Sequence, residues 1–350
     1  MALLEVNDLH VSFNSEDGVV KAVQGVSFSL DPGQTLGIVG ESGSGKSVST
    51  QTIMGLTRGA TITGEALFHG ENLLAMSSGK LRKIRGAKIA MIFQDPLSSL
   101  HPHYKVGKQI SEMIRTHESV SRADAKKRAR DLLAIVGIPQ PDRRVDDYPH
   151  QFSGGMRQRA MIAMALALNP ELLIADEPTT ALDVTVQAQI LDLIARLQGE
   201  FNTAVIMITH DLGVVAGLAD QVMVMYAGRP VEFAGRRDTY YNPHHPYTKG
   251  LIGSIPSAAA IGGKLTPIPG APPSLITLPT GCSFHPRCPV MLEQCPFEVP
   301  PLKPIGDEGH MSACFQPESY AGQVGALALK AAGGARQRTG LRRSATPREA

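Results

Sequence analysis

The chain has 350 residues, which suffices for one large α/β domain and an extension, and its 34 basic residues nearly balance 32 acidic ones. A net charge of +2 predicts no electrostatic field for binding nucleic acid. The segment MALLEVNDLH carries carboxylates and no basic region, so we expect no signal peptide, and no run is apolar enough to span a bilayer. Any role at a membrane would therefore depend on other subunits.

Residues 35–56 hold a strand-like apolar run, a glycine-rich turn and a helical pattern. The turn, GESGSGKS at residues 40–47, fills every position of the phosphate-binding pattern G-x-x-x-x-G-K-[ST], whereas a glycine-rich turn without a ligand would not need to. Glycines let backbone N–H groups surround phosphate oxygens, and the helix start adds partial positive charge. We expect Lys46 to reach the β- and γ-phosphates and the Ser47 hydroxyl to ligate Mg²⁺.

The next segment predicts a strand followed by two helices. KIAMIFQD at residues 88–95 is a strand pattern that ends near Gln94. A polar amide after a strand is usually a loop residue, but in a phosphate site Gln94 could contact Mg²⁺ or the attacking water. Residues 106–117 and 121–137 read as helices, and Ser121 can cap the second.

A second turn of the phosphate-binding kind lies further along the chain. FSGGMRQR at residues 152–159 is a Ser-Gly-Gly turn that opens a predicted helix, which is another place to hold an anion. Two separate phosphate sites in one chain suggest a nucleotide that is shared between two chains.

The run ELLIADEPTTALD at residues 171–183 is an apolar strand that ends in two carboxylates. Alone, it would be better explained as an ordinary strand end with acidic turn residues. Downstream of a phosphate loop, Asp176 stands where a Mg²⁺-holding aspartate should end the strand, and Glu177 can polarise the attacking water.

Strands and helices then alternate. A helix is expected at residues 184–198 and strands at 204–209 and 221–226, which predicts a parallel sheet with helices on both sides. The strand at 204–209 is followed by His210. A lone histidine there is more often structural, but in a phosphate site it could donate a hydrogen bond to the γ-phosphate.

From residue 240 onward proline and glycine become dense, so we expect a loop-rich extension. The tail after residue 322 is rich in alanine, glycine and arginine, and we expect it to be disordered. Its arginines could touch anionic lipid or RNA, but a solvated tail is the favoured interpretation.

The chain's four cysteines all lie in this extension, at Cys282, Cys288, Cys295 and Cys314. Without an export signal, metal ligation or free thiols are favoured over disulfides. The spacing lacks the tight repeats of bacterial ferredoxins, and zinc stays open, with His285 and His310 as further candidate ligands. Four unrelated thiols are the remaining alternative.

The strings GESGSGKS, FQDP, FSGGM, LLIADEP, ALD and ITHD occur in this order, and the chain thereby resembles the nucleotide-binding subunit of an ABC transporter. The resemblance implies that Gln94 is the Q-loop residue that links the nucleotide to membrane subunits. It also implies that Asp176 and Glu177 are the Walker B pair and His210 the switch histidine. The Walker A residues implied to bind ATP are Gly40, Ser42, Gly43, Gly45, Lys46 and Ser47.

The resemblance further implies a signature motif at Ser153, Gly154 and Gly155, which would bind the γ-phosphate of ATP held by a partner. It implies that Asp183 is the D-loop residue and that Phe13 stacks on adenine, although an aromatic in a strand is usually packing. The signature reads FSGGM where LSGGQ is common. The Ser-Gly-Gly core is intact, so this departure does not argue for an inactive site.

Longer strings place the resemblance more narrowly. FQDPLSSLHPHYKVGKQI and HPYTKGL resemble peptide and nickel importer ATPases, and GCSFHPRCPVMLEQC resembles the oligopeptide/dipeptide branch in particular. Some ATPases of that branch hold a [4Fe–4S] cluster at this cysteine pattern. The resemblance therefore implies a [4Fe–4S] site at the four cysteines, with zinc as the alternative.

The predicted fold is an α/β P-loop ATPase core of ABC type with a mixed sheet. The expected domains are residues 1–239, with a helical subdomain at about 95–170, an extension at 240–320 and a tail at 321–350. The resemblance implies an ATPase that powers import of dipeptides or oligopeptides at the cytoplasmic face of the membrane. Its partners would be a second, different ATPase subunit, two membrane permeases and, indirectly, a solute-binding protein. Nickel import, or a soluble ABC ATPase of repair or translation, is the alternative.

Overall fold

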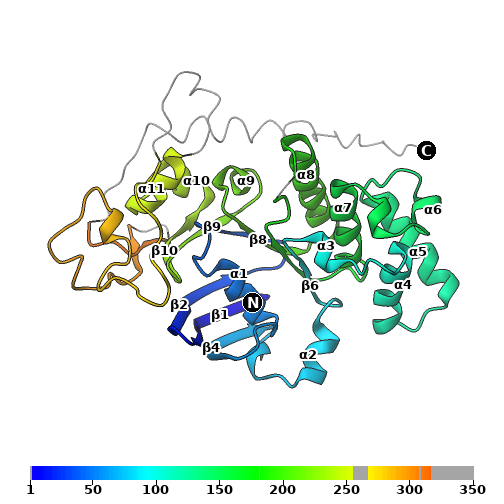
Figure 1. Ribbon diagram of the computed structural model, residues 1–350, viewed down its shortest axis with the longest axis horizontal. Coiled ribbons are helices and arrows are strands. Elements are labelled where there is room, and N and C mark those ends of the chain that lie inside the picture. The colour runs from blue at the N-terminus through cyan, green and yellow to red at the C-terminus, as the bar shows by residue number, and fades with distance from the viewer. Residues whose placement is uncertain (1, 181, 255–266, 307–308, 317–350) are drawn as a thin grey trace, which may run out of the picture.

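The computed structural model describes residues 2–180, 182–254, 267–306 and 309–316 (Figure 1). The expected tail at 321–350 lies outside the described residues, as does part of the expected extension. In the described ranges, no helix has the length and apolar character needed to cross a membrane.

A four-stranded antiparallel sheet forms the N-terminal part of the chain, in the order β2-β1-β4-β5. Its strands are β1 (Leu4–Ser15), β2 (Gly18–Leu30), β4 (Ala60–Phe68) and β5 (Glu71–Asn72). Side chains along β1 alternate between buried and exposed near its start, because one face of the strand packs on the core while the other faces solvent.

A second, eight-stranded sheet has the order β11-β12-β10-β9-β3-β8-β7-β6. Its strands are β3 (Thr35–Val39), β6 (Ile89–Ile92), β7 (Leu172–Asp176), β8 (Ala204–Thr209), β9 (Gln221–Tyr226), β10 (Arg229–Gly235), β11 (Lys303–Ile305) and β12 (His310–Ser312). The five strands from β9 to β6 are parallel, and the other three pair antiparallel. The expected mixed sheet is confirmed.

The parallel strands are buried on both faces, which explains their continuous apolar sequences. In β8, Val205 and Met207 contact the core formed with the helices on one side, whereas Ile206 and Ile208 contact the core shared with the first sheet. Figure 1 shows these layers, with α8 and α9 above the large sheet and β1, β2 and β4 below it.

From β7 to β9 helices and strands alternate in chain order, as the sequence predicts, whereas five helices follow one another between β6 and β7. The helices are α1 (Lys46–Ile53), α2 (Ser78–Ile84), α3 (Pro96–Ser99), α4 (Val106–His117), α5 (Arg122–Ile135), α6 (Pro141–Arg144), α7 (Gly154–Ala165), α8 (Val184–Phe201), α9 (Leu212–Ala216), α10 (Arg236–Tyr241) and α11 (Pro246–Gly253). The expected cap of α5 is present, since the Ser121 hydroxyl accepts the Asp124 N–H at 3.1 Å.

The extension contributes to the large sheet, which the loop-rich expectation did not include. Strand β12 pairs with β10, and the buried Glu232 carboxylate in β10 binds groups from the extension. It accepts the His244 N–H at 2.6 Å and the His245 N–H at 3.1 Å, and it lies 2.6 Å from His310 Nε2. Strands of three residues are too short to give a periodic sequence signal.

We expect the fold to lose stability as the pH falls from about 6.5 toward 4, in part because of His245. Burial lowers the pKa of His245 from 6.5 to about 4, against the opposing charge of Glu232. The unfolded chain therefore takes up a proton in this interval that the folded chain refuses, so acid favours unfolding. Protonation at Nδ1 would also remove the acceptor that caps α11 through the Tyr247 N–H, at 3.1 Å.

Urea unfolding of the full chain across this pH interval measures the effect. His245→Asn keeps a capping oxygen but cannot titrate, so its free energy of unfolding should depend less steeply on pH than that of the wild type. Equal slopes for the two proteins would contradict the assignment.

Candidate functional site

The backbone of the glycine-rich loop between β3 and α1 leaves no room for a side chain at two of its glycines. Gly40 and Gly45 have φ angles of +153° and +94°. A Cβ at Gly40 would lie 2.2 Å from the Met225 carbonyl oxygen, and one at Gly45 would lie 2.2 Å from the Ala22 carbonyl oxygen. Because Gly45 caps α1 and has no side chain, the first N–H groups of α1 remain available for an anion.

Lys46 is the buried cation of this loop, with 5% of the residue exposed. Its Nζ donates to the carbonyl oxygens of Gly40 at 2.7 Å and of Glu41 at 2.9 Å. Burial lowers the pKa of Lys46, while the carboxylates of Glu177, Asp176 and Glu41 oppose that effect. The loop thus holds an ammonium group and free helix N–H groups together, which is the chemistry that binds phosphates.

Strand β7 brings a carboxylate to the start of α1. The Ser47 hydroxyl donates to Asp176 Oδ1 at 2.8 Å, and Asp176 is 3% exposed. Burial raises the pKa of Asp176, the Ser47 hydrogen bond lowers it, and the neighbouring Glu177 charge raises it again. A hydroxyl and a buried carboxylate are hard oxygen donors, and a carboxylate without a full counter-charge suits Mg²⁺.

Glu177 has a φ of +46°, an uncommon conformation for a residue with a side chain. Its N–H donates to the Ile208 carbonyl oxygen at 2.9 Å, which ties the strained residue to β8. The Glu177 carboxylate contacts two polar side chains from other elements. Gln94 Nε2 donates to it at 2.9 Å, and His210 Nδ1 lies 3.2 Å away.

A third partner of Glu177 is Thr180, whose hydroxyl donates to the same carboxylate at 2.8 Å. Burial alone would raise the pKa of Glu177, but the hydrogen bonds from Thr180 and His210 outweigh it and hold the pKa below its usual value. The carboxylate is therefore ionised at neutral pH. Sequence reasoning did not single out Thr180; its place three residues after Glu177, in a turn, was the available signal.

One cavity of about 600 Å³ lies beside Glu177 and the phosphate loop. Gln94, Glu177 and His210 contribute to its wall beside the loop residues Glu41 and Ser42, and the rest of the wall comes from the extension, at Leu251, Ser254, Pro267 and Ile268. The structure thus brings together the end of β6, β7 and β8 and the phosphate loop.

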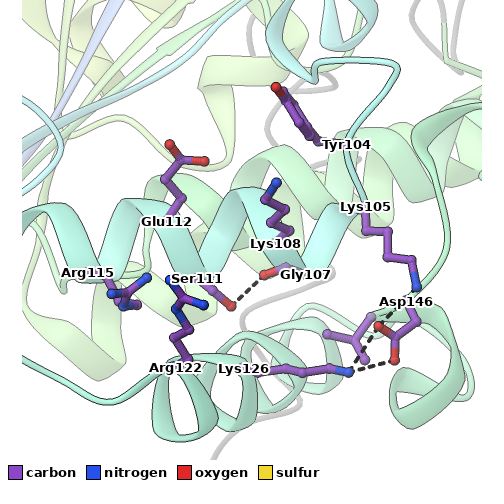
Figure 2. A pocket seen from close by; sticks show the side chains of 11 residues that line it. Tyr104, Lys105, Gly107, Lys108, Ser111, Glu112, Arg115, Arg122, Lys126 and Asp146 are labelled. Carbon is purple, nitrogen blue, oxygen red and sulfur yellow. Dashed lines mark hydrogen bonds and ion pairs between the residues drawn. The ribbon is translucent and has the colours of Figure 1, made fainter.

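A second cavity of about 600 Å³ lies between α4 and α5 (Figure 2). It is lined mainly by charged side chains, and Lys105 and Lys126 both reach Asp146 there, at 3.5 and 2.8 Å. None of the residues that line it comes from the phosphate loop. The two cavities have the same volume, but only the first is lined by residues of the phosphate loop together with Glu177 and His210.

Other predicted site residues lie elsewhere. Ser153 caps α7 and accepts the Met156 N–H at 3.3 Å, and Gly154 and Gly155 form the first turn of that helix. Asp183 caps α8. These residues are not among the described residues that line the cavity, and Figure 1 shows α7 well to the side of α1.

Phe13 lies on β1 in the first sheet, opposite Val20 and Ala60. It is partly buried and packs against the hydrophobic core. The structure therefore gives this side chain a packing role, and its contact with adenine stays a prediction.

The expected [4Fe–4S] site is wrong. Across residues 2–180, 182–254, 267–306 and 309–316, no group of three or more His, Cys, Asp or Glu side chains could hold a metal ion, which removes the support for zinc as well. Cys282, Cys288, Cys295 and Cys314 line a cavity of about 20 Å³, which has room for a water molecule but not for a cluster.

The four thiols are half-buried. Burial raises the pKa of Cys282 to about 11 and also raises the pKa values of Cys288 and Cys314. Cys282 and Cys288 pack against the core. The spacing of cysteines along the chain could not reveal how the thiols are buried.

Comparison with known proteins agrees with this geometry. The family described as "ABC transporter" matches residues 23–180, and the family described as "Oligopeptide/dipeptide transporter, C-terminal region" matches residues 231–295. The first match contains the phosphate loop and the end of β7. The second contains most of β10, all of α11 and part of the cysteine segment.

Two curated relatives match nearly the whole chain. The oligopeptide transport ATP-binding protein OppD of Salmonella typhimurium is 52% identical over 316 residues, which covers 90% of this chain and 94% of the relative. The dipeptide transport ATP-binding protein DppD of Bacillus subtilis is 51% identical over 322 residues, which covers 91% and 96%.

A solved structure also matches the core. The dimeric structure of the ATP-binding cassette MJ0796, in a post-hydrolysis state with ADP and Pi, has a TM-score of 0.61 and 27% identity. The match covers 67% of this chain and 98% of the cassette. The structure of cbiO1 from Clostridium perfringens, part of an ABC transporter complex, matches with a TM-score of 0.58. The chain therefore belongs to the ABC transporter ATP-binding subunits, within the family of oligopeptide and dipeptide transport ATP-binding proteins.

Proposed function

We propose that the chain hydrolyses ATP at this site to drive the import of dipeptides or oligopeptides, with Glu177 as the general base. The observation that carries the proposal is the set of hydrogen bonds from Gln94 and Thr180, together with His210, that holds an ionised Glu177 carboxylate in the same cavity as the phosphate loop. A carboxylate in this state can take a proton from an attacking water. The C-terminal family match and the names of the relatives favour peptides over nickel as the transported class.

The other site residues have separate roles in this proposal. Lys46 and the N–H groups of the loop bind the β- and γ-phosphates. Ser47, Asp176 and Gln94 would hold Mg²⁺, which neutralises charge on the phosphates when it is bound. His210 donates a hydrogen bond to the γ-phosphate. Positioning and electrostatics supply most of the rate enhancement.

The place of α7 supports a site shared between two chains. Ser153, Gly154 and Gly155 lie apart from the chain's own cavity, so we assign them to ATP bound by a second ATPase subunit, with Asp183 near the contact. The cassette MJ0796 is itself dimeric. We assign residues 1–239 to the nucleotide-binding domain, with helices α3 to α7 as its helical subdomain. The residues that follow, from 240 onward, belong to the extension.

The permease subunits would dock beside Gln94, where an open groove of about 340 Å³ lies between α1, α4 and α7. Apolar side chains dominate its lining, among them Met54, Leu56, Met113 and Met161, and it reaches Phe93, which is 38% exposed. An apolar helix of a permease fits this groove. Its movement would act on Gln94, which follows Phe93 in the chain, and through Gln94 on Glu177. The chain would thus attach to the cytoplasmic face of the membrane, with the solute-binding protein on the other side.

Phe93→Ser should greatly reduce the permease that co-purifies with the chain, because burial of one phenylalanine contributes about 1.5–3 kcal/mol to docking. Phe201→Ser is the matched control, since Phe201 is 37% exposed on α8, away from the groove. Equal losses for both variants, or none for Phe93→Ser, would refute this docking site. ATP binding by the isolated chain should remain in both variants.

Glu177→Gln should keep ATP binding but lower the hydrolysis rate of the assembled transporter by about 10²-fold or more, because an amide cannot accept the proton of water. It should also trap a closed dimer with ATP, which gel filtration can detect. Lys46→Ala should instead weaken ATP binding itself. Glu200→Gln on the exposed side of α8 is the control. Near-normal hydrolysis by Glu177→Gln would show that another group is the base.

Ser153→Arg should leave ATP binding to the isolated chain nearly intact while it blocks hydrolysis at the partner's site, because it places bulk where the γ-phosphate must dock. Ser121→Arg makes the same change at another helix cap, that of α5, and controls for lost capping. Hydrolysis by the complex and ATP binding by the isolated chain are both measured. Loss of ATP binding in the isolated Ser153→Arg chain would show that the motif acts within its own chain.

A further inference from the structure

The phosphate loop is tied to the extension by an ion pair across 246 positions of sequence. Arg287 Nη1 donates to Glu41 Oε2 at 2.7 Å, and its Nη2 donates to Glu41 Oε1 at 3.1 Å. The arrangement is bidentate, with both guanidinium nitrogens matched to both carboxylate oxygens. The side chain of Arg287 is 6% exposed and that of Glu41 is 28% exposed, so water screens this pair only partly.

Arg287 itself is held rigidly by its surroundings. It ends a turn of 3-10 helix at His285–Arg287, and its Nε donates to the Pro269 carbonyl oxygen at 2.8 Å. Two weaker hydrogen bonds, both at 3.3 Å, join it to the Gly270 carbonyl oxygen and the Tyr226 hydroxyl. The hydrogen bonds with Glu41 raise the pKa of Arg287, so the guanidinium stays charged throughout the physiological range.

A second group from the extension holds the same loop residue. The Tyr247 hydroxyl in α11 accepts the Glu41 N–H at 2.9 Å. Tyr247 is fully buried and packs against Tyr226, with ring centroids 4.7 Å apart. The backbone and the side chain of Glu41 are thus both fixed from outside the nucleotide-binding core.

The charge of Glu41 would otherwise oppose phosphate binding. Glu41 directly follows Gly40 in the loop, and its carbonyl oxygen accepts Lys46 Nζ at 2.9 Å. The charge of the Glu41 carboxylate acts on Lys46, the group that should attract phosphates, and the same negative charge would repel phosphates bound there. The Arg287 guanidinium cancels that charge, and Glu41 also lines the cavity that contains Glu177.

We propose that Arg287 and Tyr247 are positioning residues for ATP: the extension neutralises Glu41 and fixes the phosphate loop, and it thereby sets the affinity of the site for ATP. The inference rests on the proposed function only in that residues 40–47 bind ATP. It gives the extension a role at the nucleotide site, through side chains that do not contact the reacting atoms.

Four forms of the full chain test the charge effect by titration with Mg-ATP: wild type, Arg287→Ala, Glu41→Gln and the double variant. Arg287→Ala should weaken ATP binding about tenfold or more, because it leaves the Glu41 carboxylate unpaired beside the phosphates. Glu41→Gln alone should not weaken ATP binding, because it removes the repelling carboxylate and leaves the Arg287 guanidinium charged beside the loop. The double variant should bind much better than Arg287→Ala, since the repelling charge is gone. Added salt should narrow the gap between wild type and Arg287→Ala.

The same variants in the assembled transporter separate positioning from catalysis. Arg287→Ala should raise KM for ATP with little change in kcat, because Arg287 does not touch Glu177. Tyr247→Phe should raise KM to a smaller extent. A merely structural defect would lower the thermal stability of Arg287→Ala and of the double variant alike, and removal of the Glu41 charge would not restore affinity.

Lys46→Ala distinguishes a failure of the proposed function from a failure of the role given to Arg287. If wild type binds Mg-ATP no better than Lys46→Ala, the proposed function fails. If wild type binds well but Arg287→Ala binds equally well, or if the double variant is as weak as Arg287→Ala, this inference alone is overturned.

Discussion

The close approach of backbone to backbone around the phosphate loop is the constraint on which the rest of the structure depends. Gly40 and Gly45 leave no room for a Cβ because carbonyl oxygens of Met225 and Ala22 lie where the Cβ would stand. The loop is therefore held between β9 and the first sheet. Five parallel strands end at the same edge of the large sheet, and the residues at the ends of β6, β7 and β8 converge on the loop that follows β3.

The two neighbouring carboxylates at the end of β7 are kept chemically different by their surroundings. Burial raises the pKa of Asp176, which faces Ser47, whereas hydrogen bonds from Thr180 and His210 lower that of Glu177 against the effect of burial. Groups whose environments separate their pKa values can take different roles in one reaction. The two side chains have different partners, Ser47 for Asp176 and Thr180 for Glu177, and Glu177 lies just beyond the strand with a positive φ.

The sequence was sufficient to predict that Gln94, Glu177 and His210, which follow strands, come together in one cavity, since parallel strands bring such positions together. It could not predict contacts that depend on the folded path of the extension, such as Arg287 with Glu41 or β12 with β10. The cysteine segment shows the same limit. The sequence places four cysteines close together along the chain, but it does not show how the folded chain buries them, and the metal site expected there is absent from the described residues.

The extension is joined to the core by buried charges and not by apolar packing alone. Glu232 is fully buried beside His310, and Arg287 is nearly so beside Glu41. A buried pair adds little net stability, but the loss of one partner leaves an uncompensated charge, which is strongly unfavourable. Truncation before β12 would remove His310, and truncation before Arg287 would expose Glu41 as well. The extension therefore cannot be treated as a separable appendage, because its removal would place unpaired carboxylates in β10 and in the phosphate loop itself.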